Sequence, residues 1–329
     1  MERVNEVVSR VMMLLYLFYR GTMLKSRRMK KSKITDLLYK ADCILGESPL
    51  WHAARSSCIW LDIYGNKLFE YTPKNGVCRQ YDLPILTSYV GLSNDEQLIL
   101  ASPQGVHYFV FEEDKMELIT DLGGLGENYR CNDGAIDSKG RLWIGTTAIR
   151  TDSNGSLYMV DSQGLVSEKL TNIAISNGIA WSSDNQIMYH IDSLSKGVDA
   201  YIVKEGSGDL ERKSTPIHIP DNMGLADGMT IDRQGNLWIA LYGGYGVAKF
   251  SPDTGEVLDF VEIPCPNVTS CCFVGPDLDA LMITTAQKDM DATALSKYPL
   301  SGSVFVTRPT VPGVPIFKYS YKQNEKKSS

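Results

Sequence analysis

Four polar side chains in this sequence occupy matching positions, each just before a small residue and a hydrophobic run typical of a β-strand. They are Glu47, Asn132, Asn177 and Asp227. The gaps between them are 85, 45 and 50 residues, and the first is close to two of the shorter periods. A fixed period of this length indicates a repeat architecture, in which equivalent positions meet around one axis. Carboxylate and carboxamide oxygens gathered on one axis would suit a divalent cation.

Each of these residues has a simpler interpretation when it is taken alone. Asn177 and Asp227 precede glycine, and such pairs are ordinary turn formers. Glu47 is a poor turn residue, and its carboxylate would be costly to bury among apolar neighbours without a partner. The matched spacing of all four residues therefore favours one site. Two carboxylates and two amides suit Ca²⁺, Mg²⁺ or Mn²⁺, and the lack of His and Cys argues against a closed structural zinc site.

The elements that would hold these residues are short strands. Runs of β-branched and aromatic residues alternate with Asn, Asp, Gly and Pro turns, with almost no helical periodicity. Six similar segments begin near residues 47, 90, 132, 177, 227 and 270. This spacing predicts an all-β, six-bladed β-propeller over residues 41–318. The innermost strand of each blade starts near the mouth of the central channel, so the four polar residues would form part of a ring there.

The two ends of the chain differ from this pattern. Residues 1–40 form a basic leader with ten Lys/Arg against three Asp/Glu. Its apolar run, residues 11–19, is shorter than the roughly 20 residues of a membrane span, so no stable span is expected. The acidic residues Glu2 and Glu6 do not suit a signal peptide. The leader could be disordered, a gene-model extension, a targeting or membrane-interacting segment, or a helix docked on the domain. Residues 319–329 are expected to be a disordered tail.

Charge and cysteine content narrow the class of protein. The leader holds a net charge of +7, so the rest of the chain holds −13, which argues against nucleic acid as the main partner. Seven cysteines without a C-x-x-C pair predict reduced, mostly buried thiols and a cytoplasmic protein. Cys271 and Cys272 are adjacent in one β-like run and should point to opposite faces. We expect a monomer or a weak dimer.

The four polar residues lie in motifs that carry a resemblance to a known family. These motifs are Gly46-Glu47-Ser48-Pro49-Leu50-Trp51, Arg130-Cys131-Asn132-Asp133-Gly134, Ser176-Asn177-Gly178 and Asp227-Gly228-Met229. In order and spacing they resemble the gluconolactonase family, which includes regucalcin (senescence marker protein) and the luciferin-regenerating enzymes. The run Val268-Thr269-Ser270-Cys271-Cys272-Phe273 resembles the regucalcin branch in particular. The resemblance covers residues 41–318 and implies a six-bladed propeller that hydrolyses sugar lactones with a divalent ion in the channel mouth.

The resemblance also implies roles for individual residues. Glu47, Asn177 and Asp227 resemble the metal ligands, for one divalent cation among Ca²⁺, Zn²⁺, Mg²⁺ and Mn²⁺. Asn132 and Arg130 resemble the residues that bind the lactone, and Asp227 resembles the catalytic base. One departure concerns the loop at residues 147–155, which is shorter than is common in the family and lacks Glu. The identity of the substrate therefore stays open.

Two functions from different classes are consistent with these residues. The first is a metal-dependent lactonase, in which a polarised lactone carbonyl is attacked by water that Asp227 deprotonates. The second is a regucalcin-like calcium-binding propeller without significant turnover, which the short loop favours. Hydrolysis of other esters would use the same metal site with a different pocket lining. The expected partner is a small-molecule lactone.

Overall fold

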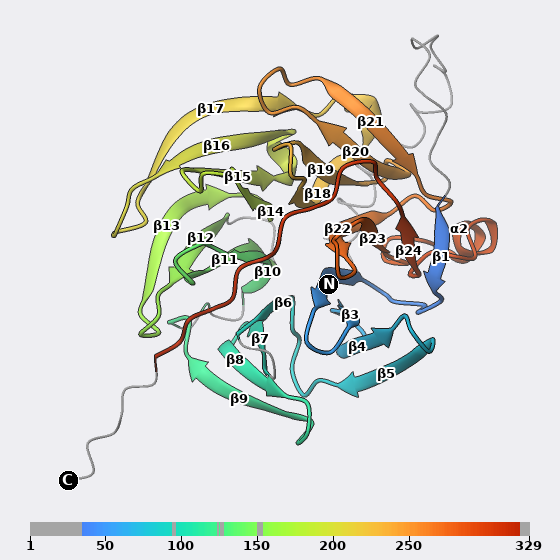
Figure 1. Cartoon of the computed structure of the whole chain (residues 1–329), viewed down its shortest axis with the longest axis horizontal. Helices are drawn as coiled ribbons and strands as arrows, with labels where there is room; N and C mark the ends of the chain where they lie inside the picture. The colour runs from blue at the N-terminus through green and yellow to red at the C-terminus, as the bar shows by residue number, and fades with distance from the viewer. Residues whose placement is uncertain (1–34, 94–96, 124, 126–127, 150–153, 323–329) are drawn as a thin grey trace.

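The computed structural model describes residues 35–93, 97–123, 125, 128–149 and 154–322. Within these ranges the strands form six four-stranded antiparallel sheets, arranged as blades around one central axis (Figure 1). The prediction of an all-β, six-bladed propeller is confirmed. Each of the six segment starts expected from the sequence lies in the innermost strand of a blade.

The first three blades run in chain order from the innermost strand outward. Blade 1 comprises β2 (Gly46–His52), β3 (Ser57–Asp62), β4 (Lys67–Thr72) and β5 (Val77–Asp82). Blade 2 comprises β6 (Tyr89–Leu92), β7 (Gln97–Ser102), β8 (Gly105–Val110) and β9 (Lys115–Thr120). Blade 3 comprises β10 (Tyr129–Ile136), β11 (Leu142–Ala148), β12 (Gly155–Val160) and β13 (Val166–Ile173).

The next two blades repeat this order. Three short helical segments lie in connections between strands within the described ranges, two of them around blade 4 and one between β23 and β24. Blade 4 comprises β14 (Ser176–Trp181), β15 (Ile187–Asp192), β16 (Gly197–Val203) and β17 (Leu210–His218). Blade 5 comprises β18 (Leu225–Ile231), β19 (Leu237–Tyr242), β20 (Gly246–Phe250) and β21 (Val257–Glu262). The helical segments are η1 (Ser193–Ser195), η2 (Asp221–Met223) and α2 (Ala292–Lys297). No helix in the described ranges is long and apolar enough to cross a membrane.

Blade 6 closes the ring with strands from both ends of the domain. Its inner strands are β22 (Val268–Val274), β23 (Ala280–Thr285) and β24 (Val304–Thr307), and its outermost strand is β1 (Asp36–Tyr39). Strand β1 pairs with β24, with Asp36 opposite Val306. Residues 36–39 were assigned to the leader from the sequence, but they complete the last sheet. Residues 1–34 lie outside the described ranges.

The hydrophobic core lies between neighbouring blades. Strands β3, β19 and β23 are buried along almost their whole length, whereas the outermost strands β5 and β9 are largely exposed. Trp143 of blade 3 packs against Trp181 of blade 4, with ring centroids 5.5 Å apart. Of the five tryptophans only Trp51 is not buried. Burial of such large side chains supplies much of the driving force that holds the blades together.

A repeated turn anchors two of these tryptophans. In blade 5 the carboxylate of Asp232 accepts hydrogen bonds from the backbone N–H groups of Gln234 and Asn236 and from Nε1 of Trp238 at 3.1 Å. Lys249 adds an ion pair at 2.7 Å to the same carboxylate. Asp137, Trp143 and Arg141 repeat this arrangement in blade 3. In these two blades the Asp-x-x-Gly turn therefore fixes the second strand to the first.

The C-terminal segment crosses one face of the propeller instead of ending at the last strand (Figure 1). The backbone N–H of Tyr319 donates to the carbonyl of Leu92, and that of Ser320 donates to the carbonyl of Gly140. Tyr319 is buried, and its hydroxyl donates to the carbonyl of Asp161. Residues 319–322 are therefore packed against the domain, although the sequence placed them in a disordered tail. Residues 323–329 lie outside the described ranges.

The cysteines have the state that the sequence predicts. All seven are free thiols, and all but Cys78 are buried. Cys271 belongs to the core cluster between blades 5 and 6, and Cys272 to the cluster between blades 6 and 1. Their side chains therefore fill space on opposite faces of β22, as alternation requires.

Candidate functional site

The four predicted site residues lie at the starts of innermost strands, where the pairing with the second strand is irregular. A shift of register separates Glu47 from Leu50, Cys131 from Gly134, Asn177 from Ile179, and Ala226 from Met229. A β-bulge of this kind redirects side chains that regular alternation would send into the sheet. The structure thus places Glu47, Asn132, Asn177 and Asp227 at or beside a bulge of an innermost strand, whereas Arg130, the fifth predicted residue, is paired with Thr147 before the bulge of β10.

The two asparagines are joined directly. Nδ2 of Asn132 donates to Oδ1 of Asn177 at 2.8 Å and to the carbonyl of Ser176 at 2.7 Å. Nδ2 of Asn177 donates to Oγ of Ser193 at 2.8 Å, and Ser193 donates to the carbonyl of Ala226 at 2.6 Å. This chain of hydrogen bonds runs from blade 3 through blade 4 to blade 5. It fixes the orientation of both amide groups.

Glu47 is held by the backbone of its own strand and by blade 2. Oε2 of Glu47 accepts a hydrogen bond from the N–H of Ser48 at 3.1 Å. Ser48 has a φ of 49°, a left-handed conformation that is unusual for a residue other than glycine. Its hydroxyl pairs with the backbone N–H and carbonyl of Val90. The strain at Ser48 is therefore offset by contacts that fix where the Glu47 carboxylate points.

Two further aspartates fix the loops that lead into the site. In blade 1 the carboxylate of Asp62 accepts from the N–H groups of Ile44 and Leu45, just before Glu47. In blade 4 the carboxylate of Asp192 accepts from the N–H groups of Ala174 and Ile175, just before Asn177. Each aspartate is the last residue of the second strand of its blade. Glu47 and Asn177, from different blades, are therefore positioned by the same pair of hydrogen bonds to the preceding loop.

A third carboxylate, that of Asp133, lies close enough to Glu47 and Asp227 to raise the pKa of both. Burial raises the pKa of Glu47 well above its usual range, and the charges of Asp227 and Asp133 raise it further. The pKa of Asp227 is raised by burial and by Asp133, and is lowered in part by Arg130 and Lys288. Burial raises the pKa of Asp133 to about 6. Asp227 is buried, whereas Glu47 and Asp133 are half-buried. The three carboxylates are close enough to destabilise each other's charged forms.

The donor set fits a divalent cation. Within the described ranges His, Cys, Asp and Glu side chains do not form a group of three that could hold a metal ion unaided, so amide oxygens would have to contribute. Glu47, Asp133 and Asp227 carry three negative charges when ionised, and Arg130 offsets one. The remaining charge matches one divalent ion, and oxygen donors are those that Ca²⁺ and Mg²⁺ prefer.

A central channel adjoins these residues, because Ser48 and Asp133, the neighbours of Glu47 and Asn132, line it. It has a volume of about 380 Å³ and is lined by the innermost strands of all six blades, including Ser48 and Asp133. Residues 314–317 of the C-terminal segment line it as well. That segment contacts Leu92 and Asp232, at the far ends of β6 and β18, whereas Glu47 and Asp227 lie near strand starts. The candidate site is thus at one end of the channel and the C-terminal segment closes the other.

Comparison with known proteins identifies the family. Residues 45–287 match the family described as SMP-30/Gluconolactonase/LRE-like region. The chain belongs to this family. It is 32% identical to regucalcin of Danio rerio over 302 residues, which is 85% of this chain and 98% of the relative.

Two solved structures of the family share the architecture. The first is regucalcin of Agrobacterium tumefaciens, described as a calcium-binding protein. Its TM-score is 0.84 at 26% identity, and the match covers 89% of this chain and 99% of that one. The second is a luciferin-regenerating enzyme, with a TM-score of 0.80 at 28% identity, covering 87% of this chain and 99% of that one. Membership of the SMP-30/gluconolactonase family supports hydrolysis of a sugar lactone at the level of the family.

The entrance to the site carries residues that the sequence alone did not indicate. The guanidinium of Arg130 lies 6.0 Å from the ring centroid of Tyr64, which is 39% exposed. The Tyr242 hydroxyl lies 2.9 Å from the Asp289 carboxylate and 3.0 Å from the Lys288 carbonyl. Arg130 was predicted from its motif, whereas Tyr64, Tyr242, Lys288 and Asp289 lie at or beyond strand ends, where no repeat pattern marks them. Only Asp133 had a signal, because it stands beside Asn132 in its motif.

His190 has a supporting place in blade 4. Its Nε2 lies 2.8 Å from Oγ of Ser176, the residue before Asn177. Burial lowers the pKa of His190 to about 4, against the opposing effect of Asp192 and Asp199. The ring is therefore neutral at pH 7 and acts as a hydrogen-bonding group inside the blade. The loop that the sequence singled out at residues 147–155 is described only in part, because residues 150–153 lie outside the described ranges.

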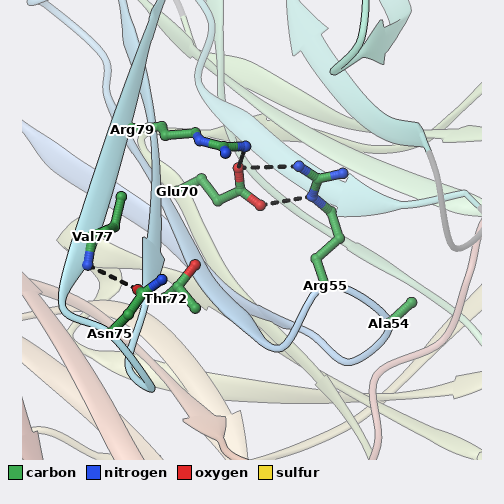
Figure 2. Close-up of a pocket in the computed structure, with 7 residues that line it drawn as sticks. All are labelled: Ala54, Arg55, Glu70, Thr72, Asn75, Val77 and Arg79. Carbon is green, nitrogen blue, oxygen red and sulfur yellow. Dashed lines mark hydrogen bonds and ion pairs between the residues drawn. The ribbon is translucent and has the colours of Figure 1, made fainter.

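A second cavity, of about 340 Å³, lies on blade 1 beside an ion-pair cluster (Figure 2). Arg55 contacts both carboxylate oxygens of the buried Glu70, at 2.6 and 3.2 Å, and Arg79 lies 4.0 Å from it. Arg55 also lies 3.7 Å from Glu112. Two guanidinium groups and two carboxylates thus balance in charge. We interpret this cluster as structural.

Proposed function

We propose that this protein is a divalent-metal-dependent hydrolase of sugar lactones. In this proposal Glu47, Asn177 and Asp227 hold the cation, Arg130 and Asn132 bind the lactone, and Asp227 is the base. The observation that carries the proposal is that Glu47 and Asp227, from blades 1 and 5, lie close enough for the charge of Asp227 to raise the pKa of Glu47. Buried carboxylates that raise one another's pKa are costly without a cation, and such clusters are characteristic of functional sites.

The proposed chemistry divides between the cation and the protein. When bound, the cation supplies a Lewis acid that polarises the lactone carbonyl, an effect worth several kcal/mol. Asp227 accepts the proton of the attacking water, and general-base help of this kind contributes about 10² to 10⁴-fold.

The substrate would be oriented by the two residues from blade 3. Nδ2 of Asn132 donates to the carbonyl of Ser176 and to Oδ1 of Asn177, so its own Oδ1 is the atom that would accept a hydrogen bond from the lactone. Arg130 donates to the carbonyl of Cys131 at 2.9 Å and retains further N–H groups for lactone hydroxyls. A polar amide and a guanidinium suit the hydroxyls of a sugar ring.

A second candidate function is calcium binding without significant turnover. It is favoured by the lack of Glu in residues 147–155 and by similarity to a regucalcin described as a calcium-binding protein. A cytoplasmic location forms part of either proposal, because the seven cysteines are free thiols. Turnover of lactones is the measurement that separates the two candidates.

The test combines metal removal with one substitution. The chelated protein should lose hydrolysis of gluconolactone, galactonolactone or arabinonolactone and regain it with Ca²⁺, Mg²⁺, Mn²⁺ or Zn²⁺. Asp227→Ala should remain folded and lose at least about 100-fold in kcat/KM, because it removes the base. Asp253→Ala, at an exposed position of the same blade, is the matched control. Full activity of the Asp227→Ala protein would contradict the proposed mechanism.

A further inference from the structure

Ser193 joins two of the proposed ligands without being one of them. It is 3% exposed and begins η1, the turn that follows the second strand of blade 4. Its Oγ lies 2.8 Å from Nδ2 of Asn177 and 2.6 Å from the carbonyl of Ala226, the residue before Asp227. Its backbone N–H donates to the carbonyl of Ile175. Ser193 is therefore fixed by its backbone while its hydroxyl bridges blades 4 and 5.

The donors and acceptors in this bridge admit one consistent arrangement. A carbonyl oxygen only accepts, so the Ser193 hydroxyl must donate to Ala226 and accept from Asn177. Rotation of the Asn177 amide by half a turn would place its NH₂ group against Nδ2 of Asn132, which is also a donor. It would also set Oδ1 against a hydroxyl whose proton is already used. The bridge thus selects the orientation in which Oδ1 of Asn177 faces Asn132 and the site.

We infer that Ser193 is a positioning residue of the metal site. It holds Oδ1 of Asn177 as a ligand and fixes its distance from the backbone that carries Asp227. The inference rests on the proposed function, since it assumes that Asn177 binds the cation. Groups that orient a metal ligand through its second polar atom typically change metal affinity about 10- to 100-fold when they are removed.

Three substitutions test this role by calorimetric titration of the full-length protein with Ca²⁺ and Mn²⁺. Ser193→Ala removes the hydroxyl, and Ser193→Cys keeps its approximate volume but provides only a weak hydrogen-bonding group. Ser195→Ala is the matched control, because that hydroxyl lies in the same turn, is exposed and donates to the carbonyl of Asp192. Thermal unfolding of the metal-free proteins shows whether each variant is folded.

The expected result is a rise of about 10- to 100-fold in the dissociation constant for both Ser193 variants and no change for Ser195→Ala. A lower kcat at limiting metal should recover in excess metal. Wild-type affinity in Ser193→Ala would overturn the inference, as would wild-type affinity in Ser193→Cys alone, since a filled cavity would then explain the effect. If the unsubstituted protein binds no divalent cation, the proposed function fails, and the inference fails with it.

Discussion

Asp133 shows at the scale of one residue what a strand pattern leaves out. The sequence marked Asn132 as a site residue and assigned no role to Asp133, its neighbour in the same motif. Regular alternation would send these two side chains to opposite faces of the sheet. The register shift between Cys131 and Gly134 breaks that alternation. Asp133 lines the channel and raises the pKa of both Glu47 and Asp227. The bulge, which depends on the pairing with β11, explains why the sequence did not reveal it.

The raised pKa values predict that metal affinity depends on pH. Burial raises the pKa of Asp133 to about 6, and the pKa values of Glu47 and Asp227 are raised in the same direction. Protons and the cation compete for these oxygens, so the dissociation constant for Ca²⁺ should fall as pH rises from about 5 to about 7.5. Titrations in two buffers of different ionisation enthalpy would measure proton release. Equal affinity at both pH values would contradict this prediction.

The same shifts give the metal-free protein a definite stability profile. A carboxyl whose folded pKa is raised stabilises the protein below its unfolded pKa, and this contribution is lost as pH rises through the folded value. The metal-free protein should therefore lose stability between about pH 4 and pH 6 and regain it on adding Ca²⁺. Asp133→Asn keeps the side-chain shape and removes one charge, so the loss should be smaller in this variant. Urea unfolding at several pH values measures both effects.

At the scale of elements, the Asp-x-x-Gly turns fix the first strand of a blade to the second. Asp232 is fully buried, and its carboxylate serves Trp238, Lys249 and two backbone N–H groups. Asp232→Ala leaves Lys249 without its buried counter-charge and should cost about 3–5 kcal/mol of unfolding free energy. The exposed Asp253→Ala should change it by less than about 0.5 kcal/mol. Denaturant unfolding measures the free energy of unfolding of the two variants. Similar values would show that the turn does not stabilise the contact between the strands.

The Glu70 cluster of blade 1 makes a second prediction at this scale. Burial raises the pKa of Glu70, but hydrogen bonds from Arg55, Tyr81 and Ser57 outweigh it and hold the pKa below its usual value. A lowered folded pKa stabilises the protein above the unfolded pKa, and this contribution is lost as pH falls through the folded value. Glu70→Gln should therefore cost about 1–3 kcal/mol at pH 7. The cost should shrink below about pH 4, and an equal cost at both pH values would contradict the charge-based explanation.

The positions of most strands could be predicted from the sequence, and the exception is β1. Four of the six blades begin with a polar residue and a hydrophobic run, a local pattern that marks β2, β10, β14 and β18 directly. Strand β1 has four residues and two exposed positions, so nothing local distinguishes it from the leader. Its place is set by pairing with β24, which lies at the other end of the domain's sequence. Ring closure is a property of the whole molecule that no local window contains.

The same holds for the C-terminal segment, which stabilises the propeller as a whole. Its backbone bonds Gly313 to blade 6, Tyr319 to blade 2, and Ser320 and Lys322 to blade 3. Residues 314–317 close the channel at the end opposite to Glu47 and Asp227. Blades that are far apart around the ring are therefore tied together by one segment. Changes in this segment should therefore lower the free energy of unfolding and leave metal affinity unchanged.

Tyr319 is the residue through which this prediction is best measured. Its ring is 2% exposed in the core of blades 2 and 3, so Tyr319→Ala should cost about 3–5 kcal/mol of unfolding free energy. Tyr319→Phe removes one of two donors to the Asp161 carbonyl, which keeps its hydrogen bond from the N–H of Gly164, and should cost about 0.5–1.5 kcal/mol. A protein ending at Lys322 keeps every contact named here and is the control for truncation at residue 310. If truncation at residue 310 left stability unchanged, or if Tyr319→Ala weakened Ca²⁺ binding as strongly as Asp227→Ala, the two ends of the channel would not be independent.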